Sequence, residues 1–517
     1  MSYISHHRIV PDMVEERKYQ ITMANACLNA NTLIILPTGL GKTIVALYVA
    51  ANILEKGKKV LLLAPTKPLV DQHSKVFSEL LINTKISVMN GLMKPENRAK
   101  VIRDNDLIVS TPQCIANDLE SEKYDLTGFG LIIYDEAHRG TGNYAYVTVA
   151  KRSNPKILSL GLTASPGSDI NKVEEVCRNL NIERIDIRTD DDPDVAPYVH
   201  DTYIKKIEVN MPQDLLDIIK YLKQMLDHYF LELTNLRLTQ TNWPVSTKHM
   251  LMVGESLQRR LARGESTSVI FRGLTIQSIC VKLLHAINLA ETQGMNSLRL
   301  YLGKIIDESN LAKGAKGNKE LVARNEFKNM WNIVETTNVE HPKISKTMSL
   351  VSQVLNAEGS SKVMVFTQYR DTCDLLVSKL STIPGANVGK LVGQSNGGLK
   401  QKEQIGVLDS FRTGEYNVIV STSVGEEGLD ITSTDAVIFY EPVPSEIRTI
   451  QRRGRTGRKN DGEVFVLIAK GTMDEVFERS GKNKEDQMRS KLEKLSNELS
   501  KNNSALFYKR QTDLSSF

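Results

Sequence analysis

A glycine-rich segment between an apolar run and a helix-forming stretch is the strongest constraint on how this chain can fold. The segment 37–43 follows the apolar residues 32–36 and precedes the helix-forming residues 43–51. Glycines allow such a loop to turn its backbone N–H groups toward one point, and a lysine and a hydroxyl follow where the helix begins. We therefore expect a phosphate-binding loop. Its residues are Pro37, Thr38, Gly39, Leu40, Gly41, Lys42 and Thr43.

The loop departs from the general phosphate-loop pattern at one position, because Leu36 stands where the first glycine would be. Lys42 is expected to neutralise phosphate oxygens, and the Thr43 hydroxyl is expected to bind Mg²⁺. A structural turn between a strand and a helix is the alternative interpretation. The buried strand before the loop and the helix after it favour phosphate binding.

Another apolar run ends in two adjacent carboxylates. The residues 132–138 read Ile-Ile-Tyr-Asp-Glu-Ala-His. Asp135 at the end of the strand is expected to hold Mg²⁺ through water, and Glu136 is expected to orient and deprotonate an attacking water. A solvated acidic turn is the alternative, and it is the weaker one beside a phosphate loop.

A third segment, residues 451–458, reads Gln-Arg-Arg-Gly-Arg-Thr-Gly-Arg. Its arginines reach the same phosphate only if a second domain folds back onto the first. A basic helix on a solvated face, or a simple RNA-binding run, is the alternative. We expect the phosphate-binding loop and this arginine segment to be the two halves of one ATP site, with ATP and Mg²⁺ as cofactors.

The length of the chain and the rhythm of its apolar runs predict several domains. A chain of 517 residues exceeds what one hydrophobic core normally supports. Short apolar runs alternate with helical stretches on both sides of a long helical region, which predicts an α/β protein with two parallel-sheet domains and a helical insert between them. The expected parts are a first α/β domain over 1–200, the insert over 201–345, a second α/β domain over 346–475, and a polar helix and tail over 476–517.

Composition excludes several classes of protein. The 5 cysteines form no CxxC pair, which argues against a zinc site and a disulfide framework and favours a reducing compartment. No run resembles a signal peptide, and none approaches the roughly 18 apolar residues of a membrane span. We therefore expect a cytoplasmic, nucleoid-associated protein. The net charge of +5 leans only mildly toward a polyanionic partner.

In the order of its segments the chain resembles the DEAH-bearing helicases of superfamily 2. This resemblance implies two RecA-like domains with ATP between them, and closure of that cleft as the mechanical step. The DEAH segment, the Leu-Thr-Ala-Ser-Pro-Gly segment, the arginine segment and the large insert are most similar to archaeal Hef and the related Fanconi anaemia M and yeast fork-remodelling helicases. Besides the segments described above, the resemblance rests on residues 17–20, 64–69, 110–113, 161–167, 365–369 and 421–430.

The resemblance implies roles for residues at the ATP site. Arg17 and Gln20 match the positions that recognise adenine, and Asp430 matches a position near the ribose. Gln451 matches a residue that contacts water or phosphate. The residues that match the arginine fingers are Arg455 and Arg458.

Loops that contact a nucleic-acid strand, mainly at its phosphates, are also implied by the resemblance. A threonine in such a loop is more often a cap or turn residue than a ligand, and this interpretation stays open for each one. The matching positions are Thr66, Lys67, Thr111, Thr367 and Thr422. The residues that match the segments coupling ATP state to domain closure are His138, Thr163 and Ser165.

Basic residues of the insert provide further candidates. A flexible basic stretch contains Lys304, Lys313, Lys316 and Lys319, with Gly314 and Gly317 between them, and we hypothesise that these lysines contact duplex phosphates. A solvated face is nearly as good an interpretation for any single lysine. A second basic cluster on a predicted helix contains Arg259, Arg260 and Arg263.

The resemblance implies an ATP-dependent, 3′-to-5′ DNA helicase or translocase that acts as a monomer on forked or branched DNA in replication-fork repair and recombination. A duplex-RNA-stimulated ATPase is the alternative, because RNA-sensing helicases of innate immunity share the layout. A non-catalytic clamp that recruits a nuclease is a third possibility. Full-length relatives carry a nuclease domain after the helicase, and this chain reaches only Phe517. The nuclease is therefore expected to be a separate partner, lost or missing by truncation, and a sliding clamp is another candidate partner.

Overall fold

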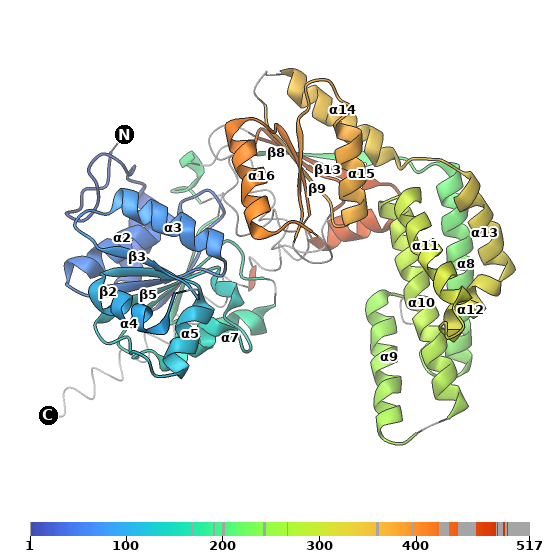
Figure 1. Cartoon of the computed structure of the whole chain (residues 1–517), viewed down its shortest axis with the longest axis horizontal. Coiled ribbons are helices and arrows are strands. Elements are labelled where there is room, and N and C mark those ends of the chain that lie inside the picture. Colours follow the sequence, from blue (N-terminus) through green and yellow to red (C-terminus); the bar gives the residue numbers. More distant parts are fainter. Residues whose placement is uncertain are drawn as a thin grey trace.

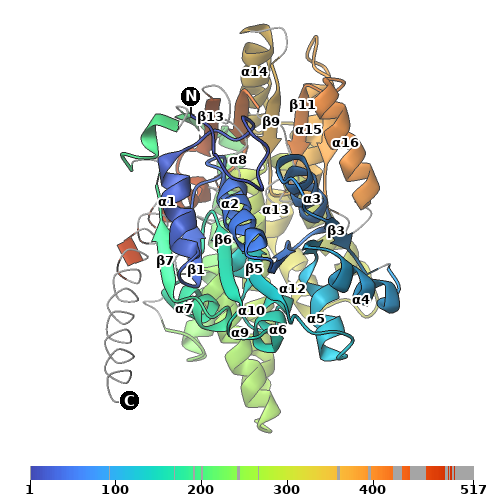
Figure 2. The same ribbon diagram turned by 90° about the vertical axis from the view of Figure 1, so that its left-hand side faces the viewer.

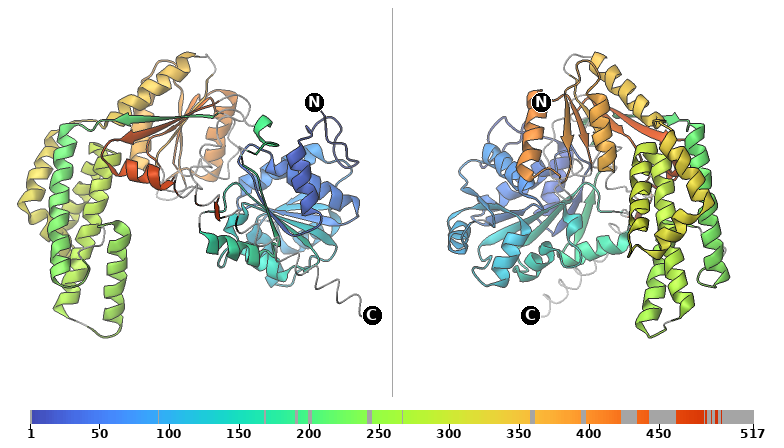
Figure 3. Two further views of the ribbon diagram at one scale, coloured as in Figure 1. Left: turned by 180° about the vertical axis from the view of Figure 1, so that it is seen from behind. Right: turned by 45° about the vertical axis from the view of Figure 1, so that its right-hand side comes forward.

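The computed structural model has three parts along the chain, an α/β domain, a bundle of helices and a second α/β domain (Figure 1). The bundle lies beside the second α/β domain, on the side away from the first, as the view from behind also shows (Figure 3). The structure describes residues 2–494 except positions 92, 168, 266 and 482 and the segments 190–191, 199–201, 241–244, 358–360, 394–397, 423–433, 443–461, 484–486, 488–489 and 492–493.

The first domain is a seven-stranded parallel sheet, with strand order β3-β4-β2-β5-β6-β1-β7. Its strands are short apolar runs, and such runs suit a parallel sheet whose two faces are both covered by helices. The strands are β1 (Thr32–Ile35), β2 (Lys59–Leu63), β3 (Ile86–Met89), β4 (Leu107–Ser110), β5 (Phe129–Asp135), β6 (Leu158–Thr163) and β7 (Arg184–Ile187).

Helices cover both faces of this sheet, which Figure 2 turns toward the viewer. Apolar residues of three helices share one core with one face of the sheet, and residues of four others share a second core with the opposite face. The first three are α1 (Lys18–Cys27), α2 (Lys42–Glu55) and α3 (Lys67–Leu80). The other four are α4 (Pro95–Asp104), α5 (Pro112–Glu120), α6 (Ala145–Arg152) and α7 (Ile170–Asn179).

The second domain is a six-stranded parallel sheet, with strand order β10-β11-β9-β12-β13-β8. Helices α14 and α15 share a core with one face, and α16 shares a core with the other. The helices are α14 (Pro342–Ala357), α15 (Arg370–Leu380) and α16 (Gln401–Thr413). The strands are β8 (Thr202–Val209), β9 (Val363–Phe366), β10 (Val388–Leu391), β11 (Val418–Ser421), β12 (Ala436–Phe439) and β13 (Gly462–Ala469).

Strand β8 corrects the expected start of the insert at residue 201. Residues 202–209 pair in parallel with β13, about 260 positions later in the chain, and form the edge of the second sheet. Lys205, Lys206 and Glu208 interrupt the apolar pattern of this strand. Charged side chains are common on edge strands, where they discourage pairing with another chain. The strand therefore has no apolar run from which the sequence could predict it.

The insert is a bundle of helices, as expected. Its helices are α8 (Gln213–Asn235), α9 (Thr247–Ala262), α10 (Ser268–Thr292), α11 (Met295–Asn310), α12 (Lys316–Ala323) and α13 (Asn325–Thr336). Helix α10 packs against α8, α9, α11 and α12. By length and composition alone α10 could cross a membrane, so the expectation that no apolar stretch has this length was wrong. Its neighbours in the bundle account for its apolar character, since a core helix passes the same test.

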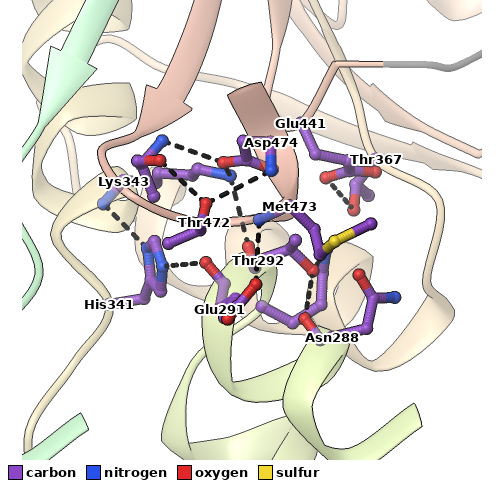
Figure 4. Close-up of polar contacts among 12 residues, drawn as sticks. Asn288, Glu291, Thr292, His341, Lys343, Thr367, Glu441, Thr472, Met473 and Asp474 are labelled. Atoms are coloured by element: carbon purple, nitrogen blue, oxygen red, sulfur yellow. Dashed lines mark hydrogen bonds and ion pairs between the residues drawn. The ribbon is translucent and has the colours of Figure 1, made fainter. Parts of the chain in front are cut away.

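A buried polar joint attaches the bundle to the second domain (Figure 4). The carboxylate of Glu291, near the end of α10, accepts a hydrogen bond from the backbone N–H of Met473 at 2.8 Å and pairs with Lys223 at 2.9 Å. Lys343 of α14 and Asp474 form an ion pair whose two side chains are fully buried. Buried charges are tolerated where they are paired and hydrogen-bonded, so these contacts fix how the two parts meet.

His341 completes this joint in its neutral form. Its Nδ1 accepts the backbone N–H of Lys343 at 3.2 Å, so Nε2 carries the proton and donates to the Glu291 carbonyl at 3.2 Å. Burial, with a contribution from the nearby Lys343, lowers the pKa of His341 to about 3.

Acid should therefore weaken the joint. An unfolded histidine has a pKa of about 6.5, so the stability that neutral His341 contributes is fully present above that pH and is lost as pH falls toward 3. At pH 5 the loss is about 2 kcal/mol. Chemical denaturation of the wild type at pH 8 and pH 5 should show it, and a His341→Gln variant should lack this part of the pH dependence. An equal pH dependence in both proteins would contradict the assignment.

Candidate nucleotide and nucleic-acid site

The loop between β1 and α2 has the backbone of a phosphate cradle. Gly39 and Gly41 adopt φ angles of 88° and 82°, a left-handed conformation that glycine adopts at little cost. The ammonium of Lys42 donates a hydrogen bond to the Leu36 carbonyl at 2.9 Å, which holds the lysine across the mouth of the loop. The predicted loop therefore lies between a buried strand and a helix N-terminus, where phosphate binding is favoured.

The buried side chain of Gln20 holds this loop by a hydrogen bond to its backbone. This side chain is 3% exposed, and its amide nitrogen donates to the Leu40 carbonyl at 2.9 Å, which also accepts the Tyr19 hydroxyl at 2.7 Å. A Cβ atom on Gly41 would lie 2.3 Å from that amide nitrogen. The amide nitrogen of Gln20 is thus committed to the loop. The guanidinium of Arg17 lies over the ring of Tyr198, 4.7 Å from its centroid.

Asp135 ends β5 beside the same loop. Its Oδ2 lies 2.8 Å from Nε2 of His73, a residue of α3, and the hydroxyl of Tyr146 donates to its backbone carbonyl. Burial alone would raise the pKa of Asp135, but His73 and the ammonium of Lys42 hold this pKa below its usual value. The Asp135 carboxylate therefore stays ionised next to the Lys42 ammonium. A carboxylate must be ionised to bind a metal ion.

The predicted coupling residues form a connected chain. Nδ1 of His138 lies 3.3 Å from the Glu136 carboxylate and 3.0 Å from the Thr163 hydroxyl. That hydroxyl accepts the backbone N–H of Ser165 at 3.2 Å. Glu136 itself has a φ of 48°, which is unusual outside glycine and is found where neighbouring structure holds a functional side chain in place. The DEAH segment therefore contacts the last residue of β6, and the hydroxyl of that residue also bonds to the segment that follows the strand.

These residues fit ATP and Mg²⁺. The donor set of the Thr43 hydroxyl and the Asp135 carboxylate consists of hard oxygen atoms, which Mg²⁺ prefers. The left-handed glycines and Lys42 match the needs of a triphosphate. The other half of the site, Asp430, Gln451, Arg455 and Arg458, lies outside the described residues.

In the first domain, the predicted strand-contacting residues lie at the N-termini of two helices. Thr66 and Thr111 are the N-cap residues of α3 and α5, and neither side chain caps its helix. The Thr66 hydroxyl is buried and has no hydrogen-bond partner among the described residues, so a strand contact at this position would use the backbone N–H groups at the start of α3. Lys67 is exposed. Helix N-termini of this kind bind phosphate groups readily.

In the second domain, the two predicted threonines are not open to a strand through their side chains. Thr367 is fully buried and its hydroxyl donates to Glu441 at 3.3 Å, while Thr422 is 6% exposed. Glu441 also accepts the backbone N–H of Gln368. A contact to nucleic acid here would have to use backbone groups or a different conformation.

The basic stretch of the insert is on the surface. Lys313, Lys316 and Lys319 are all exposed, around the start of α12. By contrast, the arginines of α9 are engaged by carboxylates, since Arg259 lies 3.2 Å from Glu255. Arg260 likewise pairs with Glu265 at 2.8 Å. None of the three lysines pairs with a carboxylate among the described residues, although Lys319 donates to the Ala312 carbonyl at 3.3 Å, so they are the better candidates for phosphate contacts.

Comparison with known proteins identifies the chain. Three family models match it in order: "Type III restriction enzyme, res subunit" over residues 13–168, "Putative ATP-dependent RNA helicase, helical bundle" over 215–341, and "Helicase conserved C-terminal domain" over 344–460. The crystal structure of the Pyrococcus furiosus Hef helicase domain superposes with a TM-score of 0.72 at 40% identity, covering 92% of this chain and 99% of that one. The chain belongs to the Hef family of superfamily 2 helicases.

Curated relatives of this Hef-family chain are longer. A Methanocaldococcus jannaschii protein named as a putative ATP-dependent RNA helicase is 38% identical over 95% of this chain and 63% of its own length. The mouse Fanconi anemia group M protein homolog is 32% identical over 92% of this chain and 26% of its own. The ATP-dependent DNA helicase mph1 of Sclerotinia sclerotiorum is 32% identical over 92% and 41%. The chain thus spans less than two thirds of each of these relatives.

Three residues at these sites had no signal in the sequence. His73, Tyr146 and Glu441 each bond to a segment that is 11 to 74 positions away in the chain. His73 and Tyr146 lie on helices whose pattern predicts only amphipathic packing. Only the folding of the strands brings them to Asp135 and Thr367.

Replacement of Lys42 by alanine should reduce ATP turnover by about 100-fold or more, because a cation aimed at developing phosphate charge is lost. Glu136→Gln should have a similar effect, because it removes the expected base for water. Steady-state phosphate release measures both, and filter binding should show that nucleic-acid affinity is largely kept. Lys56→Ala is a matched control, since Lys56 lies exposed at the other end of α2. Normal turnover in either site variant would contradict the assignment.

Proposed function

We propose that this chain is an ATP-dependent DNA helicase or translocase, with 3′-to-5′ polarity, that acts on forked or branched DNA in fork repair and recombination. The observation that carries the proposal is the convergence of the phosphate loop, the ionised Asp135 and the His138–Thr163 contact at one edge of the first sheet. Relatives named as DNA helicases support DNA as the substrate.

In ATP hydrolysis by this site, a bound Mg²⁺ would supply positive charge that neutralises the phosphates of ATP. The backbone N–H groups of the loop and Lys42 would orient the phosphates, while Asp135 and Thr43 would hold the ion. Glu136 would accept the proton of the attacking water. Arg455 and Arg458 would approach from the second domain, so that turnover requires closure of the two domains.

The chain from Glu136 through His138 and Thr163 to Ser165 supports a coupling role. It connects the base to the segment that leaves β6. A change of nucleotide state near Glu136 would thereby reach the segment that follows β6. Strand contacts at the N-termini of α3 and α5 would hold the nucleic acid mainly by its phosphates, without sequence preference.

Duplex RNA is the second candidate substrate. The helical-bundle family and the Methanocaldococcus relative both carry the description of putative RNA helicases. The phosphates of the two nucleic acids are alike, so the distinction depends on contacts to the 2′-OH and on helix shape.

Stimulation of ATP hydrolysis tests the proposal. The rate of ATP hydrolysis by the purified protein should be measured at one salt concentration with each of four nucleic acids. These are single-stranded DNA, linear duplex DNA, a forked DNA and duplex RNA. The proposal predicts the strongest stimulation by the fork. Stronger stimulation by duplex RNA would replace DNA by RNA as the substrate, and hydrolysis insensitive to all four would overturn the motor function.

The insert lysines provide a second test. Replacing Lys313, Lys316 and Lys319 together by glutamate should weaken fork binding by about 10-fold or more and reduce the slope of log affinity against log salt by about two to three, because up to three phosphate contacts are lost. Fluorescence anisotropy with a labelled fork measures both. A charge-matched control replaces the exposed Lys56, Lys151 and Lys156, which lie near the amino edge of the first sheet. Equal binding by both triple variants would remove the stretch from the site.

A further inference from the structure

His73 makes a contact with the expected metal site that the roles described above leave unexplained. Its Nε2 lies 2.8 Å from Oδ2 of Asp135. Both residues are buried, with 5% of His73 and 7% of Asp135 exposed to solvent. A carboxylate can only accept, so the geometry requires a proton on Nε2. The buried Nδ1 has no hydrogen-bond partner among the described residues. Within the described ranges, the ring of His73 therefore makes one polar contact, which is the one with Asp135.

The geometry of this contact suits a group that orients a metal-binding carboxylate. A hydrogen bond to one oxygen fixes the rotation of the Asp135 carboxylate. The carboxylate is then already ordered when the metal ion binds. Tyr146 fixes the backbone of the same residue by donating to the carbonyls of Asp135 and Leu63, at the ends of β5 and β2. Side chain and backbone of Asp135 are thus held from two different helices.

The position of His73 on α3 adds a second role. Helix α3 begins at Lys67, next to the buried hydroxyl of Thr66, which has no hydrogen-bond partner in the described part of the chain. His73 lies seven residues after Thr66, about two helical turns or roughly 10 Å along the axis. A rigid helix therefore connects the expected strand-contacting end to the carboxylate of the metal site.

We propose that His73 is the positioning residue for Asp135, and that through α3 it links nucleic-acid contact at Thr66 and Lys67 to Mg²⁺ binding. This inference rests on the proposed function, because it assumes that Asp135 holds Mg²⁺. Loss of the hydrogen bond then weakens Mg²⁺ binding and reduces the stimulation of hydrolysis by DNA, while leaving the phosphate loop in place.

Binding of a fluorescent ATP analogue, titrated with Mg²⁺ at fixed nucleotide, tests this without relying on turnover. His73→Leu should raise the half-saturating Mg²⁺ concentration by about 10-fold or more, which is typical for loss of a partner of a metal ligand. Affinity for the analogue in EDTA should stay unchanged. His73→Gln, whose amide can still donate a hydrogen bond, should recover most of the Mg²⁺ affinity. If the leucine variant does not fold, the Mg²⁺ titration of the glutamine variant tests the positioning role instead.

His249 provides a matched control. It is also 5% exposed and hydrogen-bonded through Nε2, to Thr239 at 2.8 Å, but it lies on α9 of the insert. His249→Leu should leave the Mg²⁺ titration unchanged. Equal Mg²⁺ dependence of His73→Leu and wild type would overturn the positioning role even if turnover fell. Wild-type protein that binds the analogue without any response to Mg²⁺ would instead overturn the proposed function, before any variant is compared.

Discussion

Both sheets are entirely parallel, and the rest of the structure depends on this constraint. Parallel strands end at a common edge, so the loops after β1, β2, β5 and β6 meet there although they are far apart in the chain. This topology brings together the phosphate loop, Thr66, the carboxylate of Asp135 and the segment after Thr163. No single segment could assemble such a site, because each supplies only one type of group.

Local chemistry made much of the first domain predictable. The glycine loop, the apolar run ending in Asp135 and the alternation of strand and helix each carry a signal within a few residues. Features that depend on distant pairing had no such signal. Strand β8 is a charged edge strand whose partner lies about 260 positions away, and His73 meets Asp135 across 62 positions. The buried side chain of Thr367 illustrates the reverse case, because a position in a motif does not determine which way its hydroxyl points.

The joint between bundle and second domain is another feature that only the fold reveals. The chain enters the bundle after β8 and leaves it before α14, so both crossings lie at the second domain. Glu291, His341 and the Lys343–Asp474 pair fill the contact with buried polar groups that bond across it. Because such groups tolerate little displacement, the bundle is held to the second domain more firmly than to the first, and it should follow the second domain when that domain moves.

We propose that nucleotide binding closes the first domain onto the second. The distance between the two domains, measured by single-molecule fluorescence transfer between labels at the exposed positions Lys151 and Lys402, tests it most directly. Each lysine would be replaced by cysteine, and the five native cysteines are buried, which favours labelling at the two new sites. Domain closure should shorten this distance when Mg²⁺ and a non-hydrolysable ATP analogue are added on forked DNA, and the Lys42→Ala variant should show no such change. The same distance with and without nucleotide in the wild type would contradict it.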